Sequence, residues 1–225
     1  TYPMTVKDWV LAICAEVGVV LGSTSWLNSS LVLTVEPMLE GSYRNAIQYV
    51  AEACGQFARI GRDNKLYFVS FTSSGRTIHE VFEYKVSDVY GPINLLALTR
   101  DPTNDVVIEV NQPSIDLFGE TRIKVDNNPI LDGDRSGLIG PLFDVLDGFE
   151  MNVASLEYPG DPSFDIGDEL MFIDDISVIQ TLKVTSVMFE HTGSWSGTLM
   201  AVAPSKTDID SDYSGDVSKK IKATE

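Results

Sequence analysis

The amino-acid sequence predicts an α+β protein in which a small domain with a duplicated helix–hairpin unit precedes an antiparallel β-barrel domain. Two observations indicate this class. A helical pattern that ends at a glycine occurs twice near the start of the chain, and helical periodicity is absent after Gly91. We therefore expect an α+β domain at 1–90, a mostly antiparallel β-barrel domain at 91–204 and a polar linker or tail at 205–225.

The duplicated unit aligns residues 5–21 with residues 42–58. Each copy begins with a favourable N-cap residue, Thr or Ser, and each helical pattern ends at a glycine, Gly18 or Gly55. An apolar stripe with the same spacing runs along both helices, comprising Val10, Ile13 and Val17 in the first copy and Ile47, Val50 and Cys54 in the second. A polar turn and a strand follow each glycine, so we expect two helix–hairpin units, too few for a solenoid.

The second copy contains side chains that could suggest a catalytic site. Cys54 lies on the apolar stripe, which predicts a buried contact, and neither His79 nor His191 lies in a motif that would supply a base. The turn at residues 62–65, Arg-Asp-Asn-Lys, has the composition of a hairpin connection. Because the chain has just two cysteines, Cys14 and Cys54, we expect free thiols inside helices rather than a disulfide framework.

Short β-type runs recur between turn residues after Gly91, as expected for a barrel or sandwich. These runs are 105–110, 122–126, 149–158, 169–175, 179–191 and 196–204. Alternation of apolar and polar residues is clearest in the fifth run, between Leu182 and Met188. Residues 138–148 predict one short helix within this domain.

The chain is strongly acidic, with a net charge of −17, and the excess is concentrated in one segment. Residues 101–200 carry 19 acidic and 4 basic side chains, whereas residues 1–100 carry 9 and 8. Such a charge repels phosphate backbones and excludes sequence-specific nucleic-acid binding. A solvated acidic surface is the simplest reading. No apolar run approaches the roughly 20 residues that a membrane-spanning helix requires.

The acidic residues do not match a known metal or catalytic motif. The segment 126–134, DNNPILDGD, fails the EF-hand pattern because Ile130 and Leu131 stand where an oxygen ligand and a glycine are required. Asp132 and Asp134 remain candidates for another kind of calcium site. The carboxylates are too numerous for any pair to indicate glycosidase chemistry, and no hydrolase, zinc-protease, P-loop or dinucleotide motif occurs. We predict no catalytic, cofactor-binding or metal residues, no cofactor and no enzyme activity.

Five segments, in the order in which they occur, resemble tail-hub proteins of bacteriophages and prophages, the tail-associated or prophage endopeptidase tail family, which is similar to the baseplate hub of contractile phages. They are 2–19, 42–71, 125–131, 158–174 and 182–204. The family usually begins with a β-barrel ahead of the segment that corresponds to 2–19, so that part is absent or lies before this chain.

The resemblance implies a baseplate-hub-like fold and a structural protein of the virion at the tail tip. It implies a homotrimer that caps the tail tube, contacts the distal tail and tape-measure proteins and forms a channel through which DNA leaves without specific binding. Assembly would occur in the bacterial cytoplasm, and a lytic or host-contact domain would follow the polar tail. We expect part of the acidic segment to line the channel, where it would repel DNA.

Two alternatives remain open from the sequence. A peptidoglycan hydrolase would depend on a carboxylate such as Asp168 or Asp174. A carbohydrate-binding adhesion module would present an aromatic platform at Trp26 or Trp195. Core or interface packing is the more frequent role of an isolated tryptophan, so we expect neither activity.

Overall fold

The computed structural model describes residues 2–34, 36–37, 42–100, 105–131, 135–173, 179–191 and 193–202. The chain forms two compact units, each assembled from separate stretches of sequence. Unit 1 comprises Thr1–Ser70, Asn94–Asp116 and Val125–Asp147, and unit 2 comprises Phe71–Ile93, Leu117–Lys124 and Gly148–Glu225. This interleaved division differs from the contiguous domains 1–90 and 91–204 expected from the sequence. The expected tail at 205–225 lies outside the described residues.

Long-range strand pairing explains the difference. Strand β6 (Thr72–Ile78) pairs with β12 (Asp168–Ile173), and β7 (Glu83–Tyr90) pairs with β11 (Met151–Tyr158). Local alternation identifies a strand but does not identify its partner. The sequence pattern therefore could not assign residues 72–90 to the unit that contains the later strands.

Helix α1 (Val6–Val17) begins and ends where the sequence predicted. The Thr5 hydroxyl accepts a hydrogen bond from the backbone N–H of Asp8 at 3.0 Å, and Gly18 ends the helix with a left-handed φ of 72°. The buried face includes Val10 and Ile13, as expected. Val17, the third member of the predicted stripe, is instead 48% exposed because the chain turns away from the core at Gly18.

Helix α2 (Tyr43–Ala53) ends at Cys54 and Gly55, the latter in the left-handed region at φ 63°. A Cβ at Gly55 would lie 3.2 Å from side-chain carbons of Leu142 and Val145, so the glycine also permits close packing against a later helix. The buried face of α2 is formed by small residues together with Val50 and Cys54, and Ile47 is partly exposed. Two of the three residues of the predicted stripe, Val50 and Cys54, are therefore buried, and Ala46 is buried in place of Ile47.

The first copy of the repeated unit is not a hairpin. Strands β2 (Val20–Leu21) and β3 (Val32–Leu33) follow α1 but belong to different sheets: β2 pairs in parallel with β5 (Lys65–Val69), and β3 pairs with β1 (Met4–Thr5). In the second copy, β4 (Phe57–Ile60) and β5 do form an antiparallel hairpin. The helix and its C-terminal glycine therefore occur in both copies. The antiparallel hairpin occurs in the second copy alone, because the two-residue strands of the first copy pair with other strands.

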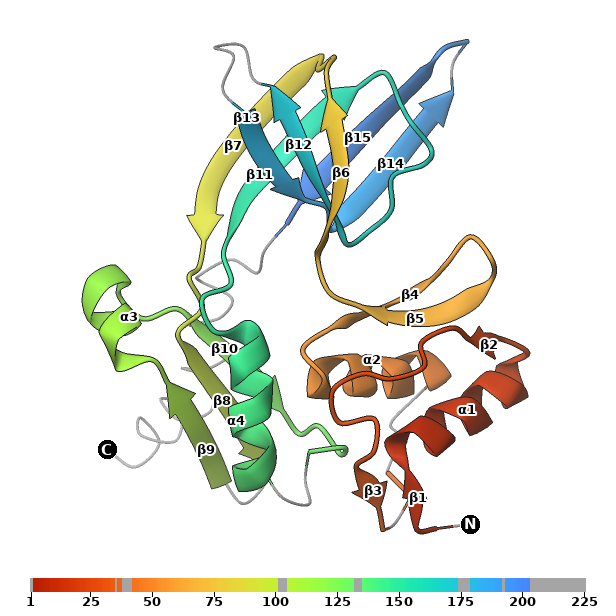
Figure 1. The fold of residues 1–225 in the computed structure, drawn as a ribbon, viewed down its shortest axis with the longest axis vertical. Helices are drawn as coiled ribbons and strands as arrows, with labels where there is room; N and C mark the ends of the chain where they lie inside the picture. Colours follow the sequence, from red (N-terminus) through yellow and green to blue (C-terminus); the bar gives the residue numbers. More distant parts are fainter. Residues whose placement is uncertain are drawn as a thin grey trace, which may run out of the picture. The chain divides into compact units, whose positions relative to one another are not determined.

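The rest of unit 1 contains a three-stranded sheet in the order β10 (Arg122–Asp126), β8 (Leu95–Arg100) and β9 (Asp105–Val110). Helix α4 (Arg135–Leu146) packs against β8 and β9 and corresponds to the predicted helix 138–148, with Pro141 inside it. Helix α3 (Gln112–Phe118) was not predicted; it buries no residue and therefore lacks an amphipathic signal. Figure 1 labels these elements; the division between the two units falls within α3 and within β10.

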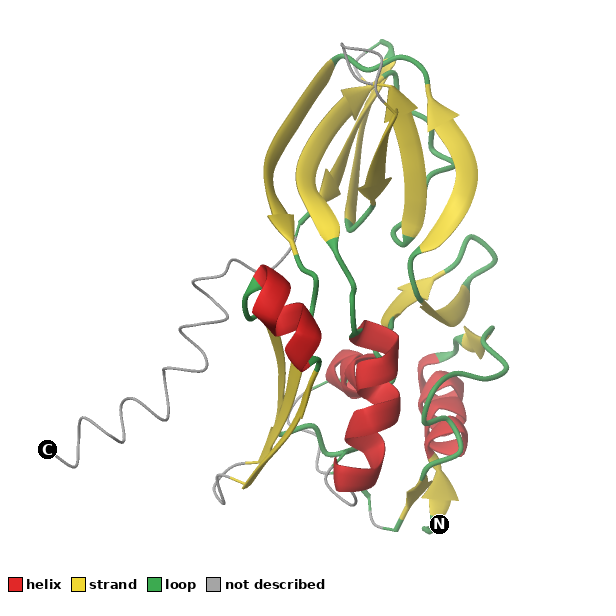
Figure 2. Ribbon diagram, turned by 60° about the vertical axis from the view of Figure 1, so that its left-hand side comes forward, coloured by secondary structure: helices red, strands yellow, loops and turns green. Residues whose placement is uncertain are grey.

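Unit 2 is built from seven strands in two sheets (Figures 1 and 2). One sheet has the order β14-β15-β11-β7 and the other β13-β12-β6, where the remaining strands are β13 (Ile179–Lys183), β14 (Ser186–His191) and β15 (Trp195–Ala201). All pairings are antiparallel except β12 with β6, which is parallel. The described strand pairings do not join the two sheets into one closed barrel, whereas the predominance of antiparallel pairs agrees with the expected mostly antiparallel domain.

The core of unit 2 is apolar and fully enclosed. Leu156, Leu170, Phe172, Leu182 and Leu199 each have 0% exposure. The run 179–191, which reads as one alternating segment, divides at Val184 and Thr185 into β13 and β14 in different sheets. The Thr185 backbone N–H and hydroxyl both donate to the Met200 carbonyl, at 2.8 and 3.1 Å. These bonds stabilise the point at which the chain passes from one sheet to the other.

Candidate functional site

The connection between β4 and β5 is a tight hairpin turn, as its composition predicted. The Gly61 backbone N–H donates to the Lys65 carbonyl at 2.8 Å, and the Asn64 N–H donates to the Gly61 carbonyl at 3.0 Å. Asn64 adopts a left-handed φ of 58°, which asparagine tolerates better than most residues. The residues 62–65 therefore have a clear structural role.

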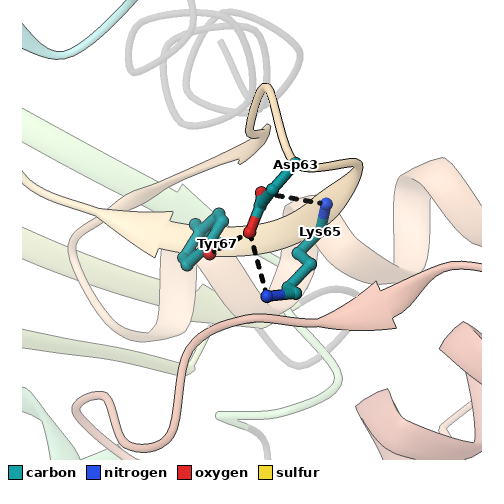
Figure 3. Close-up of polar contacts among 3 residues, drawn as sticks. All are labelled: Asp63, Lys65 and Tyr67. Atoms are coloured by element: carbon teal, nitrogen blue, oxygen red, sulfur yellow. Dashed lines mark hydrogen bonds and ion pairs between the residues drawn. The ribbon is translucent and has the colours of Figure 1, made fainter.

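Three polar side chains meet at this turn (Figure 3). The Tyr67 hydroxyl donates to Oδ2 of Asp63 at 2.8 Å, and Nζ of Lys65 lies 3.0 Å from the same oxygen. The hydrogen bond from Tyr67 lowers the pKa of Asp63, while contact with Asp63 raises the pKa values of Lys65 and Tyr67. These shifts favour ionised Asp63, protonated Lys65 and neutral Tyr67, which are their ordinary states. A catalytic acid, base or nucleophile instead needs a pKa that is shifted towards neutral pH.

The Tyr67 ring is also fixed by two glycines. A Cβ at Gly22 would lie 2.4 Å from the Tyr67 ring, and one at Gly61 would lie 2.8 Å from it. No side chain fits at either position without displacing the ring. Asp63 and Lys65 thus hold the Tyr67 hydroxyl within the hairpin, while the Tyr67 ring packs on Gly22 of the neighbouring chain segment.

The cysteines are buried thiols, as predicted from the helical pattern. Cys14 and Cys54 are free, with exposures of 3% and 1%. Burial raises the pKa of both, that of Cys54 to about 12, so neither is a thiolate near neutral pH. Both cysteines belong to unit 1, whereas His79 and His191 belong to unit 2 and are exposed.

The loop after β10 is held in place by Asn128, whose role the sequence analysis did not identify. Asn128 is 3% exposed, and its side-chain amide donates to the Tyr49 carbonyl of α2 at 2.8 Å. Asp126, the last residue of β10 before this loop, accepts a hydrogen bond from the Thr99 hydroxyl of β8. The calcium candidates Asp132 and Asp134 lie outside the described residues, and Asp126, the first residue of that segment, holds β10 to β8.

Arg135 is a second anchor that composition did not predict. It is 8% exposed, at the start of α4, and its Nη1 donates to the main-chain carbonyl of Asp105 at 2.6 Å. Its Nη2 donates to the Asp105 carboxylate. An arginine fork that contacts both the backbone and the side chain of one residue fixes α4 against the start of β9.

The tryptophans differ sharply in exposure. Trp9 and Trp26 are 5% and 8% exposed, and the Trp26 ring lies 4.8 Å from that of Phe68. Trp195 is 52% exposed. Of the two residues considered for an aromatic platform, Trp26 is therefore a core residue, and Trp195 alone is accessible.

Asp168, one of the two carboxylates considered for a hydrolase, makes a local structural contact. Oδ2 of Asp168 accepts the backbone N–H of Asp165 at 3.0 Å and so closes the turn before β12. Asp174 lies outside the described residues. Within the described part of the chain, no cluster of three or more His, Cys, Asp or Glu side chains could hold a metal ion. No helix there has the length and apolar character needed to cross a membrane.

The acidic charge is shared between the units. Unit 1 contains 15 acidic and 7 basic residues, and unit 2 contains 18 and 9. The acidic stretch 101–200 is therefore divided between the two units: its first half lies largely in unit 1 and its second half in unit 2.

Comparison with known proteins gives a relationship at the level of fold. No protein-family model and no curated protein sequence matches the chain. A tail protein from Neisseria meningitidis MC58 superposes with a TM-score of 0.54 at 14% identity, covering 92% of this chain and 69% of that one. The prophage MuSo2 43 kDa tail protein from Shewanella oneidensis gives 0.57 at 11% identity, covering 91% and 67%. The similarity to phage tail proteins inferred from the sequence is thus confirmed in the fold.

Proposed function

We propose that this chain is a non-enzymatic structural component of a phage or prophage tail, located in the virion at the tail tip or baseplate hub. The observation that carries the proposal is the shared fold, which extends over nine-tenths of the chain in two tail proteins from different bacteria. At such low identity the fold is retained while side chains vary, which suits a protein whose work is to hold a shape.

The side-chain chemistry supports a passive role. The pKa shifts at the β4–β5 hairpin favour the ordinary ionic states, and the buried thiols are protonated. The buried polar residues Asn128 and Arg135 connect elements of the fold. These residues stabilise an assembly component and do not form a reaction centre.

In the proposed assembly three copies cap the tail tube, contact the distal tail and tape-measure proteins, and surround a channel through which DNA leaves. Both units carry an excess of acidic residues, so a channel wall formed by either one would repel the DNA backbone and limit adhesion. The acidic side chains would then assist DNA release without binding it.

Co-expression with distal tail and tape-measure proteins from the same phage or prophage tests the proposal. We expect a stable complex on size-exclusion chromatography that contains three copies of this chain by light scattering. The alternative of a peptidoglycan hydrolase predicts a cleared band in a zymogram that disappears in Asp168→Asn. A cleared band together with failure to form the complex would overturn the structural role.

A further inference from the structure

The end of the β14–β15 hairpin presents two aromatic rings together. His191 and Trp195 are direct cross-strand partners in the β14–β15 ladder, so their side chains lie on the same face of the sheet. Their ring centroids are 4.9 Å apart and their planes are inclined at 58°. The two rings therefore form a corner, with the indole as one wall and the imidazole as the other.

This corner continues an aromatic row that begins in the core of unit 2. The next cross-strand pair on the same face is Phe189 and Gly197, and the Tyr158 ring lies so close to Gly197 that a Cβ there would be 2.6 Å from it. Tyr158 in turn contacts Phe164, with ring centroids 5.5 Å apart. The core end of the row is buried, whereas Trp195 is 52% exposed. The His191 ring thus lies against the indole, and about half of the Trp195 surface is accessible.

The surroundings of the corner favour a small amphipathic ligand over a protein surface. On this face of the sheet the next pair is half-buried Phe189 and buried Gly197, and Tyr158 behind them is 3% exposed, so the accessible apolar surface of the row is confined to its end at Trp195. An apolar ring face with nearby hydrogen-bonding groups is the usual composition of a small-molecule site. Imidazole can both donate and accept a hydrogen bond, which suits hydroxyl groups.

Charge narrows the class of ligand further. Nucleotide bases also stack on indoles, but their phosphates would be repelled by a chain of net charge −17. The same charge opposes binding to anionic lipid surfaces. We propose that His191 and Trp195 form a binding platform for a neutral sugar ring, which stacks on the Trp195 indole while a hydroxyl group hydrogen-bonds to the His191 imidazole. This inference goes beyond the proposed structural role and does not depend on it.

Isothermal titration calorimetry of the full chain with three neutral tetrasaccharides, maltotetraose, cellotetraose and tetra-N-acetylchitotetraose, tests the platform. We expect saturable binding of at least one, with a dissociation constant of about 1 mM or below. Trp195→Ala should weaken binding at least tenfold, and Trp195→Phe, which keeps an aromatic face, should retain most of it. His191→Ala should weaken binding severalfold.

Met188→Ala is the matched control, because Met188 is 50% exposed on the opposite face of the same hairpin. Its binding should equal that of the wild type. Intrinsic fluorescence adds a second readout: a bound sugar should shift the emission of exposed Trp195, because Trp9 and Trp26 are buried. Absence of binding to all three sugars, equal binding by Trp195→Ala, or saturable binding of choline or single-stranded DNA in their place would overturn the proposal.

Discussion

Asn128 donates its side-chain amide to the main-chain carbonyl of Tyr49, 2.8 Å away, and thereby joins the loop after β10 to helix α2. The same amide lies 3.3 Å from the Glu52 carboxylate, and the Asn128 side-chain oxygen accepts the Ile130 backbone N–H at 3.0 Å. One buried residue thus satisfies polar groups on two elements that are far apart in sequence.

Replacement of Asn128 should therefore destabilise unit 1. We expect Asn128→Ala to lower the free energy of unfolding by about 1–3 kcal/mol, because it leaves buried polar groups without partners. Asn128→Asp should cost at least as much, because a carboxylate would face the Tyr49 carbonyl and Glu52. Urea unfolding measures the change. Arg44→Ala, on the exposed side of α2, is the control and should change stability by less than about 0.5 kcal/mol; equal effects at both positions would contradict the account.

Gly22 and Tyr67 should show energetic coupling. Gly22→Ala places a Cβ within 2.4 Å of the Tyr67 ring, so it should cost about 1–3 kcal/mol through overpacking. In a Tyr67→Ala background the same substitution should be nearly neutral. A double-mutant cycle measured by urea unfolding gives the coupling energy, and additive effects would show that Tyr67 does not pack on Gly22.

Stability should fall at alkaline pH through Cys54. Burial raises the pKa of the folded Cys54 thiol to about 12, above its ordinary value of 9.0, which applies to the unfolded chain. Stability from this group is fully present below pH 9 and is lost as pH rises towards 12, because the unfolded chain releases the proton first. Between pH 8 and pH 10 the wild type should lose about 1 kcal/mol more than Cys54→Ala. Equal losses in the two proteins would show that the thiol is not buried.

The stabilising effect of Arg135 should come mainly from its hydrogen bond to the main-chain carbonyl of Asp105. Arg135→Met should destabilise the chain by about 1–3 kcal/mol, because it removes both hydrogen bonds to Asp105. Asp105→Asn should cost less than about 1 kcal/mol, because that side chain is 60% exposed and the main-chain carbonyl remains available. Chemical unfolding compares the variants, and a larger loss in Asp105→Asn would reverse this assignment.

Local features of the fold could be predicted from the sequence. The ends of α1 and α2 follow from Thr5, Gly18 and Gly55, and the β4–β5 turn follows from its Asp-Asn pair. These features depend on capping and turn preferences within a few residues, which a single sequence contains.

Features that depend on distant partners could not be predicted in the same way. The parallel pairing of β6 with β12 and the interleaved units are set by contacts between remote segments. Asn128 and Arg135 were missed because their partners, Tyr49 and Asp105, lie on other elements and leave no periodic signal. Of the two tryptophans considered for sugar binding, spacing alone could not distinguish the buried one from the exposed one.

The most direct test of the central claim is cryo-electron microscopy of phage tails purified from a bacterium that produces this chain. The account predicts density for this fold at the tail tip, in three copies around the tail axis, with acidic side chains facing the lumen. Absence of the fold from the tail particle, or its presence only away from the tip, would contradict the claim.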